Sequence, residues 1–82
     1  MGAIAKFINE KLAETEKKIE KCRGDMQKAS FCRVHNFEVE ANHIEAVTQP
    51  AMNVLFDARA MLEAIKEKVE KLEAKQKPEN NE

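Results

Sequence analysis

The sequence predicts an all-α protein, a helical hairpin that self-associates, and three observations lead to this fold class. Hydrophobic residues make up 43% of the 82 residues and charged residues 35%, with no Trp or Tyr and only four Phe. This composition is typical of helical bundles and coiled coils. Two long series of apolar residues recur at alternating intervals of three and four, the spacing of helices that pack against helices. A single change of phase between the two series indicates one reversal of the chain.

The first series occupies the N-terminal third of the chain and predicts a helix with one narrow buried face. Glu14 and Lys18 stand four residues apart in the favourable order and support the exposed face of this helix. The members of the series are Ala5, Ile8, Leu12, Thr15, Ile19, Cys22, Met26 and Ala29.

The second series begins one residue out of phase, so we expect the chain to reverse between Gly24 and Arg33. Gly24 suits the position just past a helix end, and Asp25 or Ser30 suits the start of the next helix. Residues 31–41 are rich in β-branched and aromatic residues, which leaves a short extended segment as an alternative. The series comprises Val34, Phe37, Ala41, Ile44, Thr48, Ala51, Leu55, Ala58, Leu62, Ile65, Val69 and Leu72.

Pro50 lies inside the second series and allows two architectures. A proline inside a helix removes one backbone hydrogen bond and costs about 3 kcal/mol, so it either kinks a helix or marks the start of one. The series keeps its register on both sides of Pro50, which favours one long second helix, kinked at Pro50, over residues 34–75. The alternative is a three-helix bundle in which Thr48 caps a third helix.

The chain is expected to form a single helical domain over residues 1–76, followed by a disordered tail over residues 77–82. The tail is polar and contains Pro78. Nowhere does the sequence approach the roughly 18 consecutive apolar residues of a membrane span, and no secretory signal is recognisable. A cytoplasmic location without membrane contact is therefore expected. The net charge of −1, with lysines interleaved among glutamates, argues against nucleic-acid binding.

Two cysteines and a histidine stand close together in the stretch CRGDMQKASFCRVH, residues 22–35. Cys22 and Cys32 are expected to be reduced and to serve as buried, small apolar residues, not as a disulfide, because thiols stay reduced in the cytosol. A zinc site would need Cys32, His35, His43 and Cys22 together, but only Cys32 and His35 have a metal-ligand spacing. We therefore predict no metal, no cofactor and no catalytic residues, and the protein is not expected to be an enzyme.

Interaction with another protein remains as the predicted function. The second helix is too long for the first to cover, so its apolar face should pack against further chains as a coiled coil, in a dimer or higher oligomer. We predict a stoichiometric binder of another protein, as an inhibitor or adaptor; the alternative is a sponge that encloses a small molecule between subunits. The predicted oligomer seam is Leu55, Ala58, Leu62, Ile65, Val69 and Leu72, and the predicted partner or ligand contacts are Arg33, His35, His43, Phe56 and Arg59.

Four apolar residues off the series widen the apolar surface after Pro50. They suit either the inner core of a bundle or a groove that faces a partner, and methionine serves in both roles. They are Met52, Val54, Phe56 and Met61.

Overall fold

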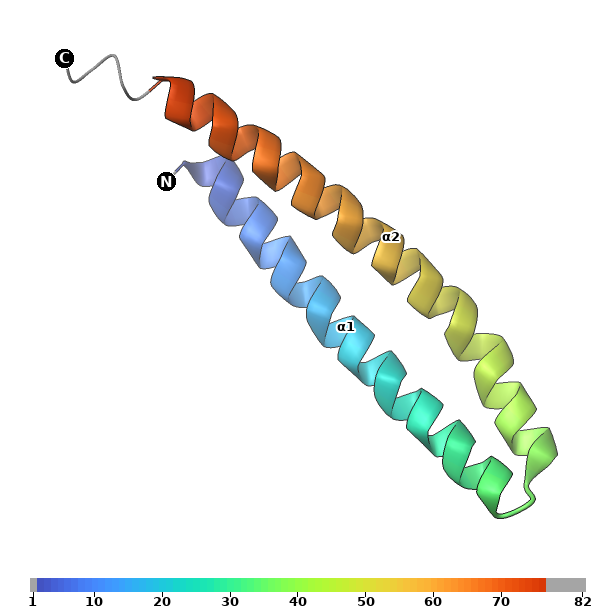
Figure 1. The fold of residues 1–82 in the computed structure, drawn as a ribbon. Coiled ribbons are helices and arrows are strands. Elements are labelled where there is room, and N and C mark those ends of the chain that lie inside the picture. The colour runs from blue at the N-terminus through green and yellow to red at the C-terminus, as the bar shows by residue number, and fades with distance from the viewer. Residues whose placement is uncertain (1, 77–82) are drawn as a thin grey trace.

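Two antiparallel α-helices joined by a short turn make up the protein (Figure 1), in a computed structural model that describes residues 2–76. Helix α1 spans Ala3–Val34 and helix α2 spans Glu38–Gln76. The hairpin is a rod of 68 × 16 × 14 Å. The predicted all-α helical hairpin is thereby confirmed. The predicted tail over residues 77–82 lies outside the described residues.

The buried face of α1 follows the first apolar series. Five of its members are buried, namely Ala5, Ile8, Thr15, Ile19 and Ala29. The other three, Leu12, Cys22 and Met26, are half-buried. Ile19 is the largest fully buried side chain among the described residues, so the core of the hairpin is thin. The prediction that one narrow face of the first helix packs against a second helix is confirmed.

The turn lies at residues 35–37, and the expected reversal between Gly24 and Arg33 is wrong. Asn36 adopts a φ of 66°, which is left-handed backbone that asparagine tolerates better than most residues. The Phe37 N–H donates to the Cys32 carbonyl at 2.7 Å, and the Asn36 N–H donates to the Arg33 carbonyl at 3.2 Å. This pair of bonds is the Schellman motif, which satisfies the last carbonyls of a helix.

Gly24 lies inside α1, so it does not cap a helix, and neither Asp25 nor Ser30 starts one. A Cβ atom added at Gly24 would meet nothing within 4 Å, so neither close packing nor a positive φ explains the glycine there. Residues 31–41 contain the end of α1, the turn and the start of α2, with no strand among them. The alternative of an extended segment is therefore wrong as well.

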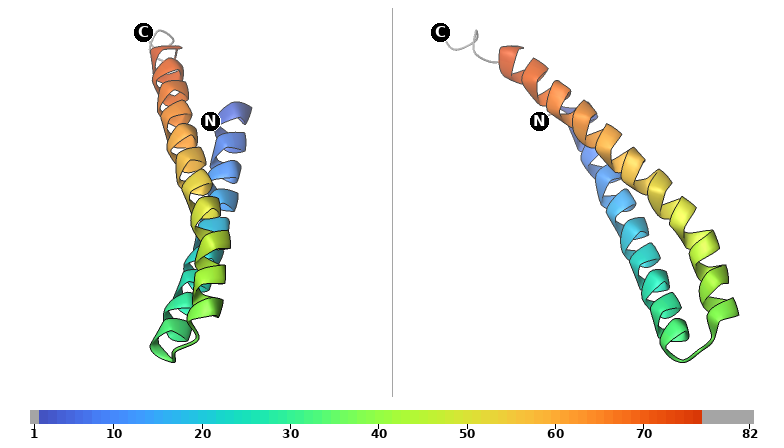
Figure 2. Two further views of the ribbon diagram at one scale, coloured as in Figure 1. Left: turned by 90° about the vertical axis from the view of Figure 1, so that its right-hand side faces the viewer. Right: turned by 45° about the vertical axis from the view of Figure 1, so that its right-hand side comes forward.

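Helix α2 continues through Pro50 without interruption (Figures 1 and 2), which excludes the three-helix bundle. Pro50 and Ala46, whose carbonyl loses its helical partner, are both exposed. Water can therefore hydrate the free carbonyl, which lowers the cost of an interior proline. A kink at this position remains a prediction.

The second apolar series is only partly covered by α1. Ala41 and Thr48 are buried, and Leu55, Leu62 and Val69 are half-buried at intervals of seven residues after them. Other members of the series are largely exposed, with 77% for Val34, 52% for Phe37, 46% for Ile65 and 58% for Leu72. Within residues 2–76, neither helix has an apolar stretch long enough to cross a bilayer.

Candidate protein-interaction surfaces

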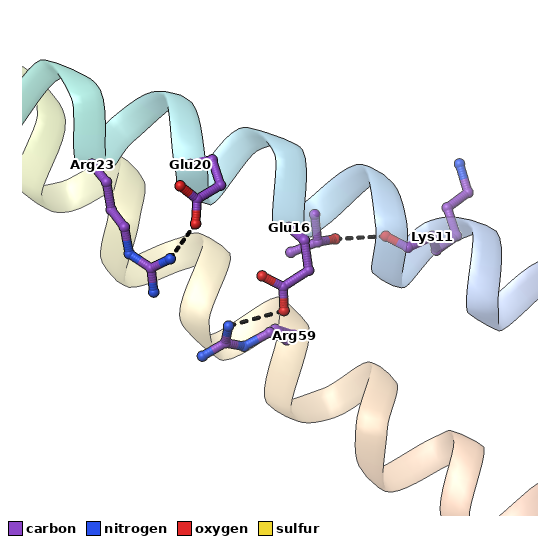
Figure 3. Close-up of polar contacts among 6 residues, drawn as sticks. Lys11, Glu16, Glu20, Arg23 and Arg59 are labelled. Carbon is purple, nitrogen blue, oxygen red and sulfur yellow. Dashed lines mark hydrogen bonds and ion pairs between the residues drawn. The ribbon is translucent and has the colours of Figure 1, made fainter.

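One edge of the hairpin is held by ion pairs between the two helices. The Arg59 guanidinium of α2 donates to the Glu16 carboxylate of α1 at 3.0 Å (Figure 3), and it also lies 5.3 Å from the centre of the Phe56 ring. Near the turn, Arg33 of α1 approaches the Glu45 carboxylate at 2.7 Å. Glu45 and Arg59 are 14 residues apart, two heptads, so both lie along the same edge of α2. We call these four residues, Glu16, Arg33, Glu45 and Arg59, the polar edge.

Arg33 has a second partner across the turn. Its guanidinium donates to the side-chain oxygen of Asn42 at 3.3 Å. The hydrogen bond to Glu45, with the charge of that carboxylate, raises the pKa of Arg33, so the guanidinium stays charged throughout the physiological range. All these groups are partly exposed, so the ion pairs contribute little net stability.

The opposite edge of α2 is apolar and open. Along it, hydrophobic residues recur at alternating intervals of three and four, interrupted by Lys68. The exposed fraction is 62% for Val47, 66% for Val54 and 64% for Met61. We call this set the α2 stripe. It consists of Ile44, Val47, Ala51, Val54, Ala58, Met61, Ile65 and Leu72.

Three shallow hollows lie between α1 and α2 along this open side, with volumes of about 390, 450 and 320 Å³. The first joins Ala58, Met61 and Ile65 to Lys11 and Lys18. The third is lined on its α1 side by charged residues, Asp25 and Lys28, and on its α2 side by residues that include Ile44 and Val47. The second is formed by Gly2, Ala3, Ile4, Val69, Leu72 and Glu73. For much of its length, α1 therefore borders the stripe with charged side chains and does not cover it with apolar ones.

A second exposed apolar surface lies at the turn. Phe31 is 61% exposed, Val34 77%, Phe37 52% and Val39 79%. The His35 ring contacts the Phe31 ring with 4.2 Å between their centroids. We call Phe31, Val34, Phe37 and Val39 the apolar tip. Sequence periodicity does not predict this surface, because it places the reversal between Gly24 and Arg33 instead of at residues 35–37.

The predicted partner contacts are divided between distant places. Arg33 and His35 lie at the apolar tip, and His43 lines the third hollow on α2. Phe56 and Arg59 lie farther along α2. Arg59 lies 14 residues beyond Glu45, the ion-pair partner of Arg33, which is about 21 Å along the helix at 1.5 Å per residue. Arg33 and Arg59 each pair with a carboxylate of the same chain, so within one chain the predicted contacts do not form a single site.

The residues of the predicted oligomer seam lie in two different columns of α2. Its members Leu55, Leu62 and Val69 are half-buried in the hairpin. Ala58, Ile65 and Leu72 belong to the α2 stripe. Of the four residues that widen the apolar surface, Met52 and Phe56 are half-buried, whereas Val54 and Met61 are exposed on the stripe. The half-buried residues that pack within the chain and the apolar residues that stay exposed thus occupy neighbouring columns of one helix.

Cys22 and Cys32 are free thiols and half-buried. Within residues 2–76 no group of three His, Cys, Asp or Glu side chains could hold a metal ion.

Comparison with known protein families, curated proteins and solved structures finds no match to this chain. The polar edge, the α2 stripe and the apolar tip are therefore the features from which a function is inferred.

Proposed function

We propose that this protein acts without catalysis, as a self-associating helical hairpin that binds another protein in stoichiometric amounts and serves as an inhibitor or adaptor. The observation that carries the proposal is the amount of apolar surface outside the core. Ile8 and Ile19 are the large hydrophobic side chains buried among the described residues, while the α2 stripe and the apolar tip stay uncovered. Large exposed apolar patches on soluble proteins mark interaction sites.

The apolar tip is the surface we assign to the partner protein. Two phenylalanines and two valines project from the end of a rigid rod, where a concave pocket on another protein can enclose them. Buried aromatic anchors of this kind dominate the energetics of many interfaces. Arg33, His35, Glu38 and Glu40 provide a polar rim around them. The α2 stripe is then free for association between copies of the chain.

The proposed place of action is the cytoplasm, where free thiols such as Cys22 and Cys32 stay reduced. Nucleic acid is not a proposed partner, because lysines are mixed with glutamates along α1 and the C-terminal half of α2, and residues 38–58 carry no lysine or arginine at all.

The test compares Phe37→Ser at the tip with the matched change Phe7→Ser near the start of α1. The two rings have similar exposure, 52% and 56%. We expect the immobilised wild-type protein to capture one protein from cells of its source, and calorimetry with the purified partner to give a fixed stoichiometry. Phe37→Ser should weaken this binding at least tenfold, and Phe7→Ser should leave it within a factor of two. Equal effects of the two changes, or no partner bound by the wild type, would overturn the proposal for the tip.

A further inference from the structure

We infer that the α2 stripe is occupied by the same stripe of a second copy of this chain, with the two α2 helices antiparallel around a two-fold axis. The inference rests on the self-association proposed above and adds the surface, the partner and the orientation. In the resulting dimer, α2 and its symmetry mate form the centre of a four-helix bundle, and each α1 packs on the outside.

The length and period of the stripe fit another helix. From Ile44 to Leu72 it covers four heptads, about 42 Å at 1.5 Å per residue. Apolar positions sustained over that many heptads are the pattern of a helix–helix seam. Helix α2 packs the column of Ala41, Thr48 and Leu55 against α1, and in the dimer it packs the stripe against a second helix. Helices in four-helix bundles carry a wide apolar face of this kind.

The shape of the monomer, a thin rod, leaves little room for a core of its own. The radius of gyration is 19.1 Å, compared with about 12 Å for a compact chain of this length. A second hairpin laid alongside the first would widen the rod without lengthening it. It would also bury the half-covered residues of α2 in a core between the two hairpins.

The charges of α2 favour the antiparallel orientation. Between residues 38 and 58 the helix has four carboxylates and no lysine or arginine, whereas residues 59–76 have five basic and four acidic side chains. Parallel helices would place the two acidic halves side by side. Antiparallel helices place each acidic half beside the balanced half of the other copy, which lowers the repulsion between the two α2 helices. Residues 17–34 of α1, with six basic and two acidic side chains, offset part of this acidic charge within each hairpin.

Side-chain size points to the same orientation. The stripe has two columns, of which one contains the small residues Ala51 and Ala58 and the other contains Val54 and Met61. In a parallel pair each residue faces the same residue of the other chain, so that alanine meets alanine and Lys68 meets Lys68. In an antiparallel pair centred near residue 56, Ala58 faces Val54 and Ala51 faces Met61. Small side chains then meet large ones in every central layer, which is the condition for a filled core.

The first experiment measures mass by sedimentation equilibrium for the wild type, Val54→Glu and Val39→Glu. Both valines are exposed on α2, at 66% and 79%, but only Val54 belongs to the stripe. We expect the wild type and Val39→Glu to have twice the monomer mass of 9.4 kDa, and Val54→Glu to dissociate at least a hundredfold more readily. A monomeric wild type would overturn the self-association itself. A dimer that Val54→Glu leaves intact would overturn only the assignment of the stripe.

The second experiment determines the orientation by distances between spin labels in the full chain carrying Cys22→Ala and Cys32→Ala. Labels are placed at Ala60→Cys or Ala74→Cys, two exposed alanines on the same outer column of α2. An antiparallel dimer centred near residue 56 separates the labels along the bundle by about 12 Å at position 60 and about 54 Å at position 74. A parallel dimer would give equal distances at the two positions and would overturn the antiparallel assignment while leaving the proposed binding functions intact.

Discussion

Asn36 determines where the chain reverses. Its left-handed φ of 66° allows the two Schellman hydrogen bonds that end α1, and α2 begins two residues later at Glu38. Asparagine and glycine adopt this conformation at low cost, whereas a β-branched residue does not. The left-handed backbone that Asn36 tolerates therefore stabilises the turn at this position and the register of the two helices.

We expect Asn36→Val to lower the free energy of unfolding by about 1–2 kcal/mol, because valine is strained at positive φ. Asn36→Gly should change it by less than about 0.5 kcal/mol, since glycine accepts the same backbone conformation. Urea unfolding followed by circular dichroism measures both changes. If valine and glycine had the same effect, the left-handed turn at residue 36 would be contradicted.

The cysteines are expected to act as packing residues. Changing Cys22 and Cys32 together to alanine should preserve the helical content and lower the free energy of unfolding by about 1–3 kcal/mol through lost contacts. A chelator should change neither the circular dichroism spectrum nor the melting temperature of the wild type. Unfolding by the chelator, or zinc at one equivalent per chain, would instead reveal a structural metal site.

At the scale of the elements, α2 accommodates Pro50 because the proline lies on an exposed side of the helix. The missing N–H leaves the carbonyl of Ala46 exposed to water instead of orphaned in a core. The apolar columns of α2 keep their spacing on both sides of Pro50, so the helix contacts α1 before and after it.

We expect Pro50→Ala to raise the free energy of unfolding by about 2 kcal/mol. The alanine restores the hydrogen bond to Ala46 and removes the clash of the ring, which outweighs the greater freedom of the unfolded chain. Calorimetry should show a higher melting temperature, and sedimentation should show an unchanged mass. A lower melting temperature together with a new oligomeric state would mean that packing requires the proline.

The whole molecule combines a thin core with a long apolar face. Leu62 is half-buried beside Thr15 in the first hollow, whereas its neighbour Glu63 is exposed. Since the hairpin has few fully buried side chains, each half-covered residue of α2 should matter both for folding and for association.

Leu62→Asp should therefore lower the free energy of unfolding by about 3 kcal/mol or more and abolish assembly, because it places a charge between the helices. Glu63→Ala should change the stability by less than about 0.5 kcal/mol. Unfolding curves and sedimentation equilibrium on the two variants provide the comparison. Similar losses for both would show that the register of α2 is misassigned.

Self-association also predicts that stability depends on concentration. The melting temperature of the wild type should rise when the protein concentration is raised in two tenfold steps, because mass action favours the folded oligomer. A melting temperature independent of concentration would indicate that the hairpin folds as a monomer.

The sequence by itself determined the all-α class, the hairpin, the buried face of α1 and the continuity of α2 through Pro50. Each of these follows from periodicity, which is a local property: residues three and four apart share one face of a helix whatever the helix packs against. The series from Ala5 to Ala29 was sufficient to identify a buried face, and the unbroken register around Pro50 favoured one continuous second helix over a third helix.

Only the tertiary structure decided where the chain reverses and which column of α2 faces α1. Both Gly24 and Asn36 can end a helix, and packing selected Asn36 because the buried series of α1 continues past Gly24 to Ala29. The face of α2 was ambiguous because its apolar arc is wider than one partner helix can cover. Contact with α1 centres on Ala41, Thr48 and the residues that follow at intervals of seven, and it leaves the α2 stripe exposed. Which part of a wide apolar face is buried depends on the position of the opposing helix, and that position is a property of the folded pair.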